Sequence, residues 1–81
     1  MIIALDYDKT YTADPELWED FIHSATNRGH TVKIVTMRHP SEAIPDRTVD
    51  VVYTSRMAKS KVVSADIWID DSPHWIYQDA L

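Results

Sequence analysis

Two pairs of aspartates follow apolar stretches of this sequence, at positions where carboxylates can bind a metal ion. Asp6 and Asp8 come directly after the run Ile2-Ile3-Ala4-Leu5, and Asp70 and Asp71 end the segment IWIDD. Clustered carboxylate oxygens are hard ligands suited to Mg²⁺, which binds through one or two carboxylates together with a substrate phosphate. A carboxylate can also attack phosphorus and form an aspartyl phosphate, while a second acid moves the proton of the leaving group. The four acids therefore predict a Mg²⁺ site and chemistry at phosphorus.

Hydroxyl and cationic side chains follow the other apolar stretches. Thr36 ends the segment TVKIVT and Arg38 comes soon after it, while Lys59 and Lys61 come after the segment VDVVYT. A threonine hydroxyl and a lysine ammonium can hold phosphoryl oxygens and offset the charge that develops on them. Taken singly, Thr36 also fits a strand-end hydroxyl, and the lysines also fit a solvated helix face. Together with the acids they favour a phosphate site, and we prefer Lys59 because it lies nearer the strand edge.

These residues must be positioned by elements that alternate along the chain. Asp14 and Pro15 form a helix start, and Gly29, the single glycine, stands where a helix C-terminal cap belongs. Alternating strands and helices imply a parallel sheet with helices on both faces, whose ligands bind beyond the carboxyl ends of the strands. The expected elements are a strand over 2–7, a helix that begins at 15 and is capped by Gly29, a strand over 31–36, a helical turn over 40–43, a strand over 49–54, a short helix over 56–62, a strand over 65–70 and a final helix from 73 to 80.

Length and composition limit the class of protein. The 81 residues predict a single domain over 1–81 with a thin core, which leaves room for homo-oligomerisation. The sequence has no cysteine and no apolar stretch near the roughly 20 residues that cross a bilayer, so we expect a cytoplasmic protein without membrane contact. The net charge of −5 argues against nonspecific nucleic-acid binding but not against an anionic substrate held through a cation.

The motifs resemble those of the haloacid dehalogenase superfamily of phosphotransferases, and they occur in that family's order. The family's first motif, Asp-x-Asp-x-Thr after an apolar strand, is matched by DYDKT. Its second is a Thr or Ser that ends the next strand, its third a lysine near a helix start, and its fourth an acidic pair that ends a further strand. The residues that match these motifs are Asp6, Asp8, Thr10, Thr36, Lys59 or Lys61, Asp70 and Asp71.

The resemblance implies a fold and a role for each matched residue. The fold would be a three-layer α/β/α Rossmann-like arrangement around a small parallel sheet of strand order 3-2-1-4, with no cap domain. Asp6 would be the nucleophile and a Mg²⁺ ligand, and Asp8 would be the general acid and base with its backbone carbonyl on the metal. Thr36 and the lysine would bind the phosphoryl group, and Asp70, Asp71 or both would complete the metal site.

The expected function is therefore a Mg²⁺-dependent phosphomonoester hydrolase, a phosphatase that works through an aspartyl phosphate on Asp6. The alternative is a non-catalytic module of the same family that binds metal or phosphate, which small size and Lys9, where family members commonly have glycine, would favour. A receiver-type phosphoacceptor domain is a third reading, but there the acidic pair comes early in the chain. Without a cap, substrate contacts would come from the surrounding loops. Candidates are Thr10, Lys9, Arg38 and Lys61, with a nucleotide or a nucleic-acid end as the phosphorylated substrate.

Overall fold

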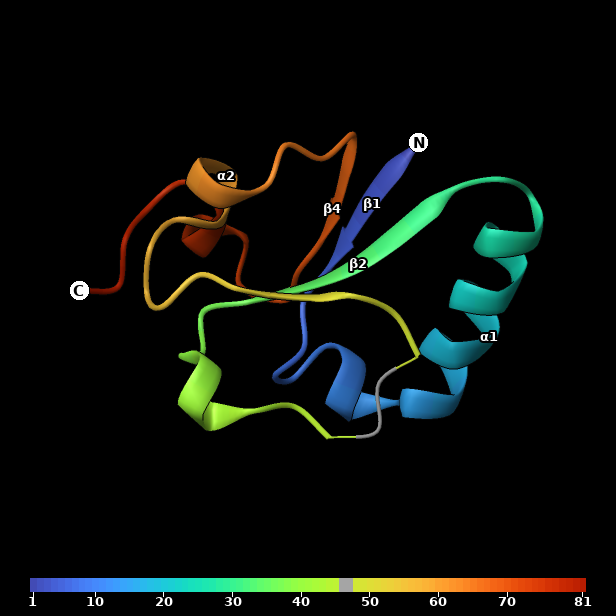
Figure 1. Cartoon of the computed structure of the whole chain (residues 1–81), viewed down its shortest axis with the longest axis horizontal. Helices are drawn as coiled ribbons and strands as arrows, with labels where there is room; N and C mark the ends of the chain where they lie inside the picture. The colour runs from blue at the N-terminus through green and yellow to red at the C-terminus, as the bar shows by residue number, and fades with distance from the viewer. Residues whose placement is uncertain (46–47) are drawn as a thin grey trace.

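The computed structural model describes residues 1–45 and 48–81, and these build a small α/β arrangement on one parallel sheet (Figure 1). The strands lie in the order β3-β2-β1-β4, and each neighbouring pair runs parallel. The predicted parallel sheet and its strand order are thus confirmed. The strands are β1 (Ile2–Leu5), β2 (Thr31–Thr36), β3 (Val51–Tyr53) and β4 (Ile67–Ile69).

Helix α1 (Pro15–Asn27) begins and ends with the signals expected from the sequence. The Asp14 side chain accepts a hydrogen bond from the Leu17 N–H at 3.2 Å, and Pro15 occupies the first helical position. Gly29 follows the helix with a φ of 84°, the left-handed region in which glycine meets no steric penalty. The chain can therefore turn at once from α1 into β2.

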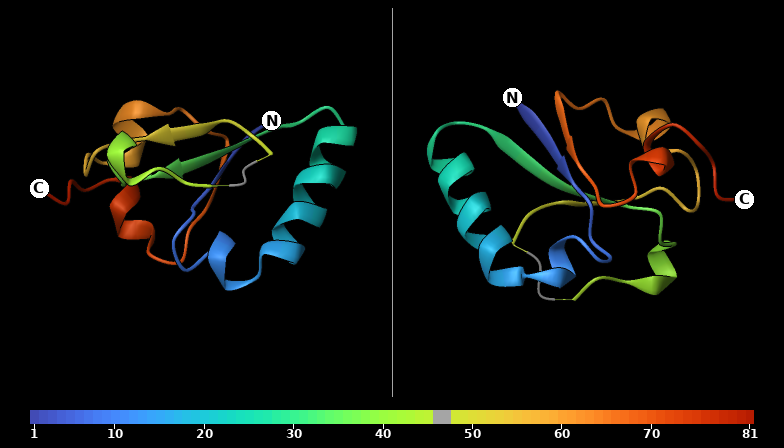
Figure 2. Two further views of the ribbon diagram at one scale, coloured as in Figure 1. Left: turned by 60° about the horizontal axis from the view of Figure 1, so that its bottom comes forward. Right: turned by 180° about the vertical axis from the view of Figure 1, so that it is seen from behind.

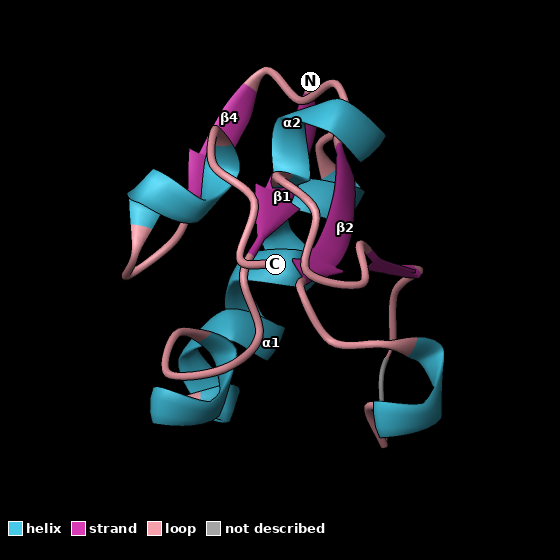
Figure 3. Cartoon of the chain, turned by 90° about the vertical axis from the view of Figure 1, so that its left-hand side faces the viewer, coloured by secondary structure: helices cyan, strands magenta, loops and turns pink. Residues whose placement is uncertain are grey.

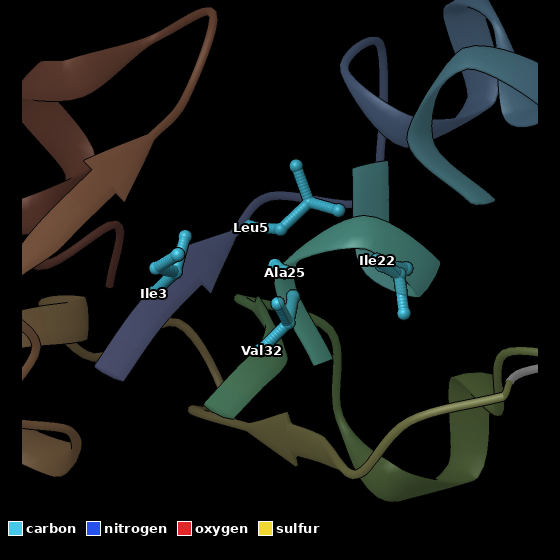
Figure 4. Close-up of a cluster of buried hydrophobic side chains, with 5 residues drawn as sticks. All are labelled: Ile3, Leu5, Ile22, Ala25 and Val32. Atoms are coloured by element: carbon cyan, nitrogen blue, oxygen red, sulfur yellow. The ribbon is translucent and has the colours of Figure 1, made fainter. Parts of the chain in front are cut away.

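The core lies on both faces of the sheet, and α1 and α2 (Lys59–Val62) stand on opposite sides of the strands (Figure 2). Successive side chains of a strand point to opposite faces, so Ile3 and Leu5 of β1 face α1 while Ala4 faces the other side. The cluster under α1 is drawn in Figure 4 and consists of Ile3, Leu5, Ile22, Ala25 and Val32. The opposite cluster consists of Ala4, Val35 and Val63.

The expected final helix over 73–80 is wrong. The chain forms only a 3₁₀ turn, η3 (Pro73–Ile76), and then runs on until the Ala80 N–H donates to the Arg56 carbonyl at 2.7 Å. The Ser72 side chain makes no capping hydrogen bond to this turn, although Ser72-Pro73 looks like a helix start. The contact with the loop after β3 takes the place of further helical hydrogen bonds.

Other elements are shorter than expected, and the helical layer opposite α1 is a single turn of helix. The strand expected over 2–7 ends at Leu5, those over 49–54 and 65–70 keep three residues each, and the short helix begins at Lys59. The turn expected over 40–43 is η2 (Pro40–Glu42), and η1 (Tyr11–Ala13) precedes α1. Among the described residues, no helix has the length and apolar character that crossing a membrane requires.

Candidate functional site

A pocket of about 310 Å³ lies where the four strands end. Figure 3 faces this edge of the sheet, and the end of the chain, marked C, lies in front of it. Because the strands are parallel, the loops that follow them all meet here, as the sequence predicts. The lining residues are Asp6, Asp8, Lys9, Thr36, Met37, Arg38, Arg56, Lys59, Asp70, Asp71, Ser72, Trp75 and Ala80.

Three carboxylates form a compact group at one end of the pocket. Asp6 follows β1, and Asp70 and Asp71 follow β4, which pairs directly with β1 through Leu5 and Ile69. One oxygen of each carboxylate lies within 4.8 Å of the other two, an arrangement that could hold a metal ion. Asp6 and Asp70 are 64 residues apart in the sequence, and the pairing of β1 with β4 brings them together, with the Asp6 N–H bonded to the Ile69 carbonyl at 2.9 Å.

Lys59 provides the positive charge nearest to this group. Its side chain is 4% exposed, and its Nζ donates to Asp6 Oδ1 and Asp70 Oδ2, each at 2.6 Å. A buried ammonium is stable only with such partners, because leaving it unpaired would cost several kcal/mol. Lys61 lies two residues further along α2 and turns to Asp79 at 2.8 Å, outside the pocket. Of the two candidate lysines, the structure places Lys59 in the pocket.

Thr10 joins two of the three carboxylates. Its Oγ1 lies 2.9 Å from Asp6 Oδ2 and 3.0 Å from Asp71 Oδ1, and it accepts a hydrogen bond from the Asp71 N–H at 3.1 Å. A hydroxyl has one hydrogen to donate, so it can satisfy only one of the two carboxylates at a time. The indole of Trp18 on α1 donates to the Thr10 carbonyl at 2.9 Å and so fixes this loop. The facing oxygen of the other carboxylate then lacks this donor, and a bound cation could serve it.

The protonation of Asp6 reflects this shortage of positive charge. Burial raises the pKa of Asp6 to about 6; Lys59 lowers it, and Asp70 and Asp71 add to the rise. At Asp71 burial also acts to raise the pKa, but hydrogen bonds from Asp6 and Thr10 outweigh it and the pKa is lowered. Below about pH 6 this pair therefore holds its first proton on Asp6. With all three acids ionised, Lys59 leaves two negative charges uncompensated, the charge that one divalent cation neutralises.

Asp8 lies apart from the three clustered carboxylates. Its side chain is 51% exposed, and both of its oxygens accept from Arg38, Nη2 at 2.7 Å and Nε at 3.0 Å. The Arg38 guanidinium also stands over the Tyr7 ring, 5.1 Å from its centre. Asp8 was expected to offer its backbone carbonyl to the metal and its carboxylate as a proton carrier, and in this structure the carboxylate is paired with Arg38.

Thr36 ends β2 with its side chain turned into the protein and its hydroxyl at the pocket. It is 1% exposed, and its Oγ1 accepts the Arg38 N–H at 3.3 Å. Because that bond uses an oxygen lone pair, the hydroxyl hydrogen can be donated to a ligand in the pocket. The structure thus brings Thr36, Lys59 and Asp6 to one pocket, as the sequence suggests.

Lys9 has a backbone conformation that glycine would adopt more easily. Its φ is 66°, in the left-handed region that a side chain makes unfavourable, and its N–H donates to Thr12 Oγ1 at 2.9 Å. Arg56 in the loop after β3 shares this backbone conformation with a φ of 71° and also lines the pocket. Both positions favour glycine sterically, and both hold a cationic side chain.

Several lining residues were not among the sequence candidates for the site. Ser72 looks like a helix cap, but its N–H donates to Asp70 Oδ1 at 3.0 Å and thereby orients that carboxylate. Trp75 looks like a packing residue and lines the pocket, as does Ala80 from the last residues of the chain. The position of Ser72 directly after the acidic pair is the one signal that could have identified it. Nothing in the sequence marks Ala80.

Comparison with known proteins gives one match. The family model described as protein kinase C delta/epsilon/eta/theta, C2 domain, matches residues 6–75 of this chain. No curated protein and no solved structure matches the chain significantly. The matched segment runs from the first clustered carboxylate, Asp6, to Trp75 and so contains nearly all of the pocket residues.

This match overturns the resemblance to the haloacid dehalogenase superfamily, because the family that it names is a different one. The expected phosphomonoester hydrolase with an aspartyl phosphate on Asp6 is corrected with it. The motif residues do not identify the family, because acids, a hydroxyl and a lysine at strand ends can bind a cation and an anion as well as take part in catalysis. A C2 match suggests a fold other than a parallel sheet of order β3-β2-β1-β4. The sheet observed in this chain therefore differs from the fold that the family match suggests.

Proposed function

The chain belongs to the protein kinase C delta/epsilon/eta/theta C2-domain family, and from this premise we propose that it is a binding module. Its pocket holds a divalent cation and, beside the cation, a phosphoryl group. The observation that supports this most is the group formed by Asp6, Asp70 and Asp71, with one oxygen from each carboxylate within 4.8 Å of the other two. The matched family is a C2 domain, and the match names no hydrolase.

The charge balance of the pocket supports a divalent cation. Lys59 neutralises one of the three clustered carboxylates, and the single hydroxyl of Thr10 serves only one of the two oxygens that face it. A doubly charged ion would neutralise the remainder and supply the positive partner that burial of Asp6 demands. Binding would also displace the proton that the raised pKa of Asp6 retains.

We propose Mg²⁺ as the cation. The described cluster offers one oxygen from each of three carboxylates, and Mg²⁺ commonly combines such a small set with waters and phosphate oxygens in an octahedron. Ca²⁺ takes roughly six to eight oxygens, which this cluster would have to draw from water or ligand. The chemistry of the donors therefore favours Mg²⁺ when a phosphoryl group is bound at the same time.

The phosphoryl group would lie between the cation and the hydroxyl of Thr36. The Thr36 hydroxyl has a hydrogen to donate at the pocket, and the Lys59 ammonium has a third hydrogen beyond those given to Asp6 and Asp70. Charge-assisted hydrogen bonds of this kind are the strong ones, so both groups favour an anion. An anion alone would meet three carboxylates, which is why we couple its binding to that of the cation.

Thermal unfolding tests the cation site. The chain is treated with a chelator, and its Tm is then measured with increasing MgCl₂ or CaCl₂, each with and without sodium phosphate. A ligand at a hundred times its Kd stabilises the folded state by about 2.7 kcal/mol, which corresponds to roughly 10 to 20 °C in a domain of this size. We expect Mg²⁺ to raise the Tm and phosphate to raise it further only when Mg²⁺ is present.

The variant Asp71→Asn separates binding from folding, because Asp71 lies next to Thr10 and Ser72 while Lys59 keeps both of its own partners. It should lose most of the Mg²⁺ response. The matched control is Asp20→Asn, which removes an exposed carboxylate of α1 and should respond like the unchanged chain. An equal response in both variants, or none in the unchanged chain, contradicts the proposal. Sustained Mg²⁺-dependent hydrolysis of a phosphomonoester in these samples would contradict a role limited to binding.

A further inference from the structure

The charges around the pocket are segregated by strand. The clustered carboxylates follow β1 and β4, at one end of the pocket. Three cationic residues follow β1, β2 and β3 in turn, and they are Lys9, Arg38 and Arg56. Since the sheet order is β3-β2-β1-β4, the end of the pocket near β4 is acidic and the end near β3 is basic. We call the three cationic residues the basic rim.

The two arginines of the basic rim have exposed partners that an anionic ligand can replace. Arg38 is paired with Asp8, whose side chain is 51% exposed, and Arg56 Nη2 lies 3.2 Å from Glu42 Oε1, also an exposed carboxylate. The exposed Arg56–Glu42 pair contributes little free energy, so exchanging Glu42 for a phosphoryl group is inexpensive, whereas the bidentate Arg38–Asp8 pair is stronger. Arg56 Nη1 also donates to the Met37 carbonyl at 2.7 Å, which holds the side chain against the loop after β2.

Backbone conformation gives the second, independent observation. Among the described residues, the non-glycine residues with positive φ are Lys9, Ser55 and Arg56, and all lie in loops at the carboxyl edge of the sheet. The chain keeps cationic side chains at two positions where glycine would relieve strain. Strain of this kind gathers at ligand-binding positions. Of these three residues, Lys9 and Arg56 line the pocket, and both are cationic.

From these two observations we propose that the ligand carries a second phosphoryl group, which the basic rim binds. The inference rests on the proposed function, because the first phosphoryl group is the one beside the cation. The ligand class is therefore a diphosphate, with one phosphoryl group at the acidic end and the other toward Lys9 and Arg56. A pocket of about 310 Å³ is at the small end of ligand sites, which accommodates a diphosphate and leaves little enclosed room beyond it.

The test compares two inorganic probes, pyrophosphate and orthophosphate, by calorimetric titration of the whole chain. Mg²⁺ is kept in excess so that complexation by pyrophosphate leaves the free cation concentration constant. We expect pyrophosphate to bind at least about tenfold more tightly than orthophosphate, the size of one additional charge-assisted hydrogen bond. Titration with ADP then shows whether a nucleoside on the diphosphate is tolerated.

Three variants assign the preference to the basic rim. Lys9→Gly removes a cation and relieves backbone strain, so it should fold, and the preference for pyrophosphate should fall about tenfold. Arg56→Gln should act in the same direction. The matched control is Arg28→Gln, which removes one positive charge at the far end of α1 and should keep the preference. The three substitutions remove the same net charge, so a general electrostatic effect would appear in all of them.

The outcomes separate this inference from the proposed function. Equal affinity for the two probes in the unchanged chain, or an unchanged preference in Lys9→Gly, overturns the second phosphoryl site while Mg²⁺ binding stands. A chain whose Tm does not respond to Mg²⁺ in the absence of any anion overturns the proposed function first. A tenfold loss of preference in both rim variants, with none in the control, is the expected result.

Discussion

Replacing Lys59 with methionine tests the electrostatic reasoning most directly. The side chain is 4% exposed and bonds at 2.6 Å to both Asp6 and Asp70, whose side chains are 11% and 3% exposed. Methionine keeps the volume and removes the charge, so two buried carboxylates lose their common partner. Removing one member of a buried ion pair destabilises a protein by roughly 3–5 kcal/mol, a large part of the ~4–12 kcal/mol expected for a domain of this length.

The assay is chemical unfolding followed by far-ultraviolet circular dichroism, at pH 7.5 in the presence of a chelator. We expect Lys59→Met to lose about 3–5 kcal/mol and to recover part of it on addition of Mg²⁺, because the cation then takes over neutralisation of the carboxylates. Affinity for Mg²⁺ should rise, since the ammonium no longer occupies Asp6 and Asp70. Lowering the pH to 5 should also shrink the loss, because a protonated Asp6 needs no partner.

The matched control is Lys61→Met on the same short helix. Lys61 is 53% exposed and pairs with Asp79, so its loss should change stability only slightly. If Lys59→Met is as stable as Lys61→Met without a cation, the carboxylates are not in need of positive charge, and the reasoning behind the cation site is refuted. An absence of any Mg²⁺ response in Lys59→Met would be equally damaging.

Three further predictions follow from single features of the structure. Lys9→Gly should raise the free energy of unfolding by about 1 kcal/mol in urea titrations, because the left-handed backbone is no longer strained; a loss of stability would show that the lysine side chain offsets the strain. Without a cation, stability should fall by up to about 3 kcal/mol as the pH rises from 4 to 7, because the pKa of Asp6 is about 6 in the folded chain against its ordinary value of 3.8. The unfolded chain releases this proton near pH 4 and the folded chain near pH 6, so Asp6→Asn should flatten the profile. Leu5→Ala should cost about 2–5 kcal/mol, since Leu5 is fully buried beneath α1; a smaller cost in the same titration would mean that the thin core collapses around the gap.

Local sequence signals determined much of the sheet and one helix. The apolar run from Ile2 predicts a strand buried on both faces, and β1 lies inside the sheet, which fits that burial. The strand order was implied by the family resemblance and not by local signals. Asp14, Pro15 and Gly29 set the ends of α1 because capping depends on residues adjacent in sequence. The sequence predicts that the acids after β1 and β4 lie close together, because the carboxyl ends of parallel strands meet at one edge of the sheet.

The family and the reaction were not determined by the same signals. Asp6, Thr36 and Lys59 meet at one pocket as expected, yet residue types and order do not distinguish a catalytic site from one that binds a cation and an anion. The family match, which spans residues 6–75, replaced the motif-based assignment. The final helix failed for a different reason, because a long-range contact between Ala80 and Arg56 outweighs local helical propensity.

Only the tertiary structure decided which charges face each other. Asp8 looks equivalent to Asp6 in the sequence, but Arg38 from the loop after β2 holds it away from the acidic cluster. Lys59 and Lys61 are two residues apart, and the direction of α2 gives one to the pocket and the other to Asp79. The sequence by itself thus determined the four strands, the helix α1 and the residues that follow the strands, but not the final turn. Electrostatic pairing acts across space between loops, so the partner of each charge follows only from how those loops pack.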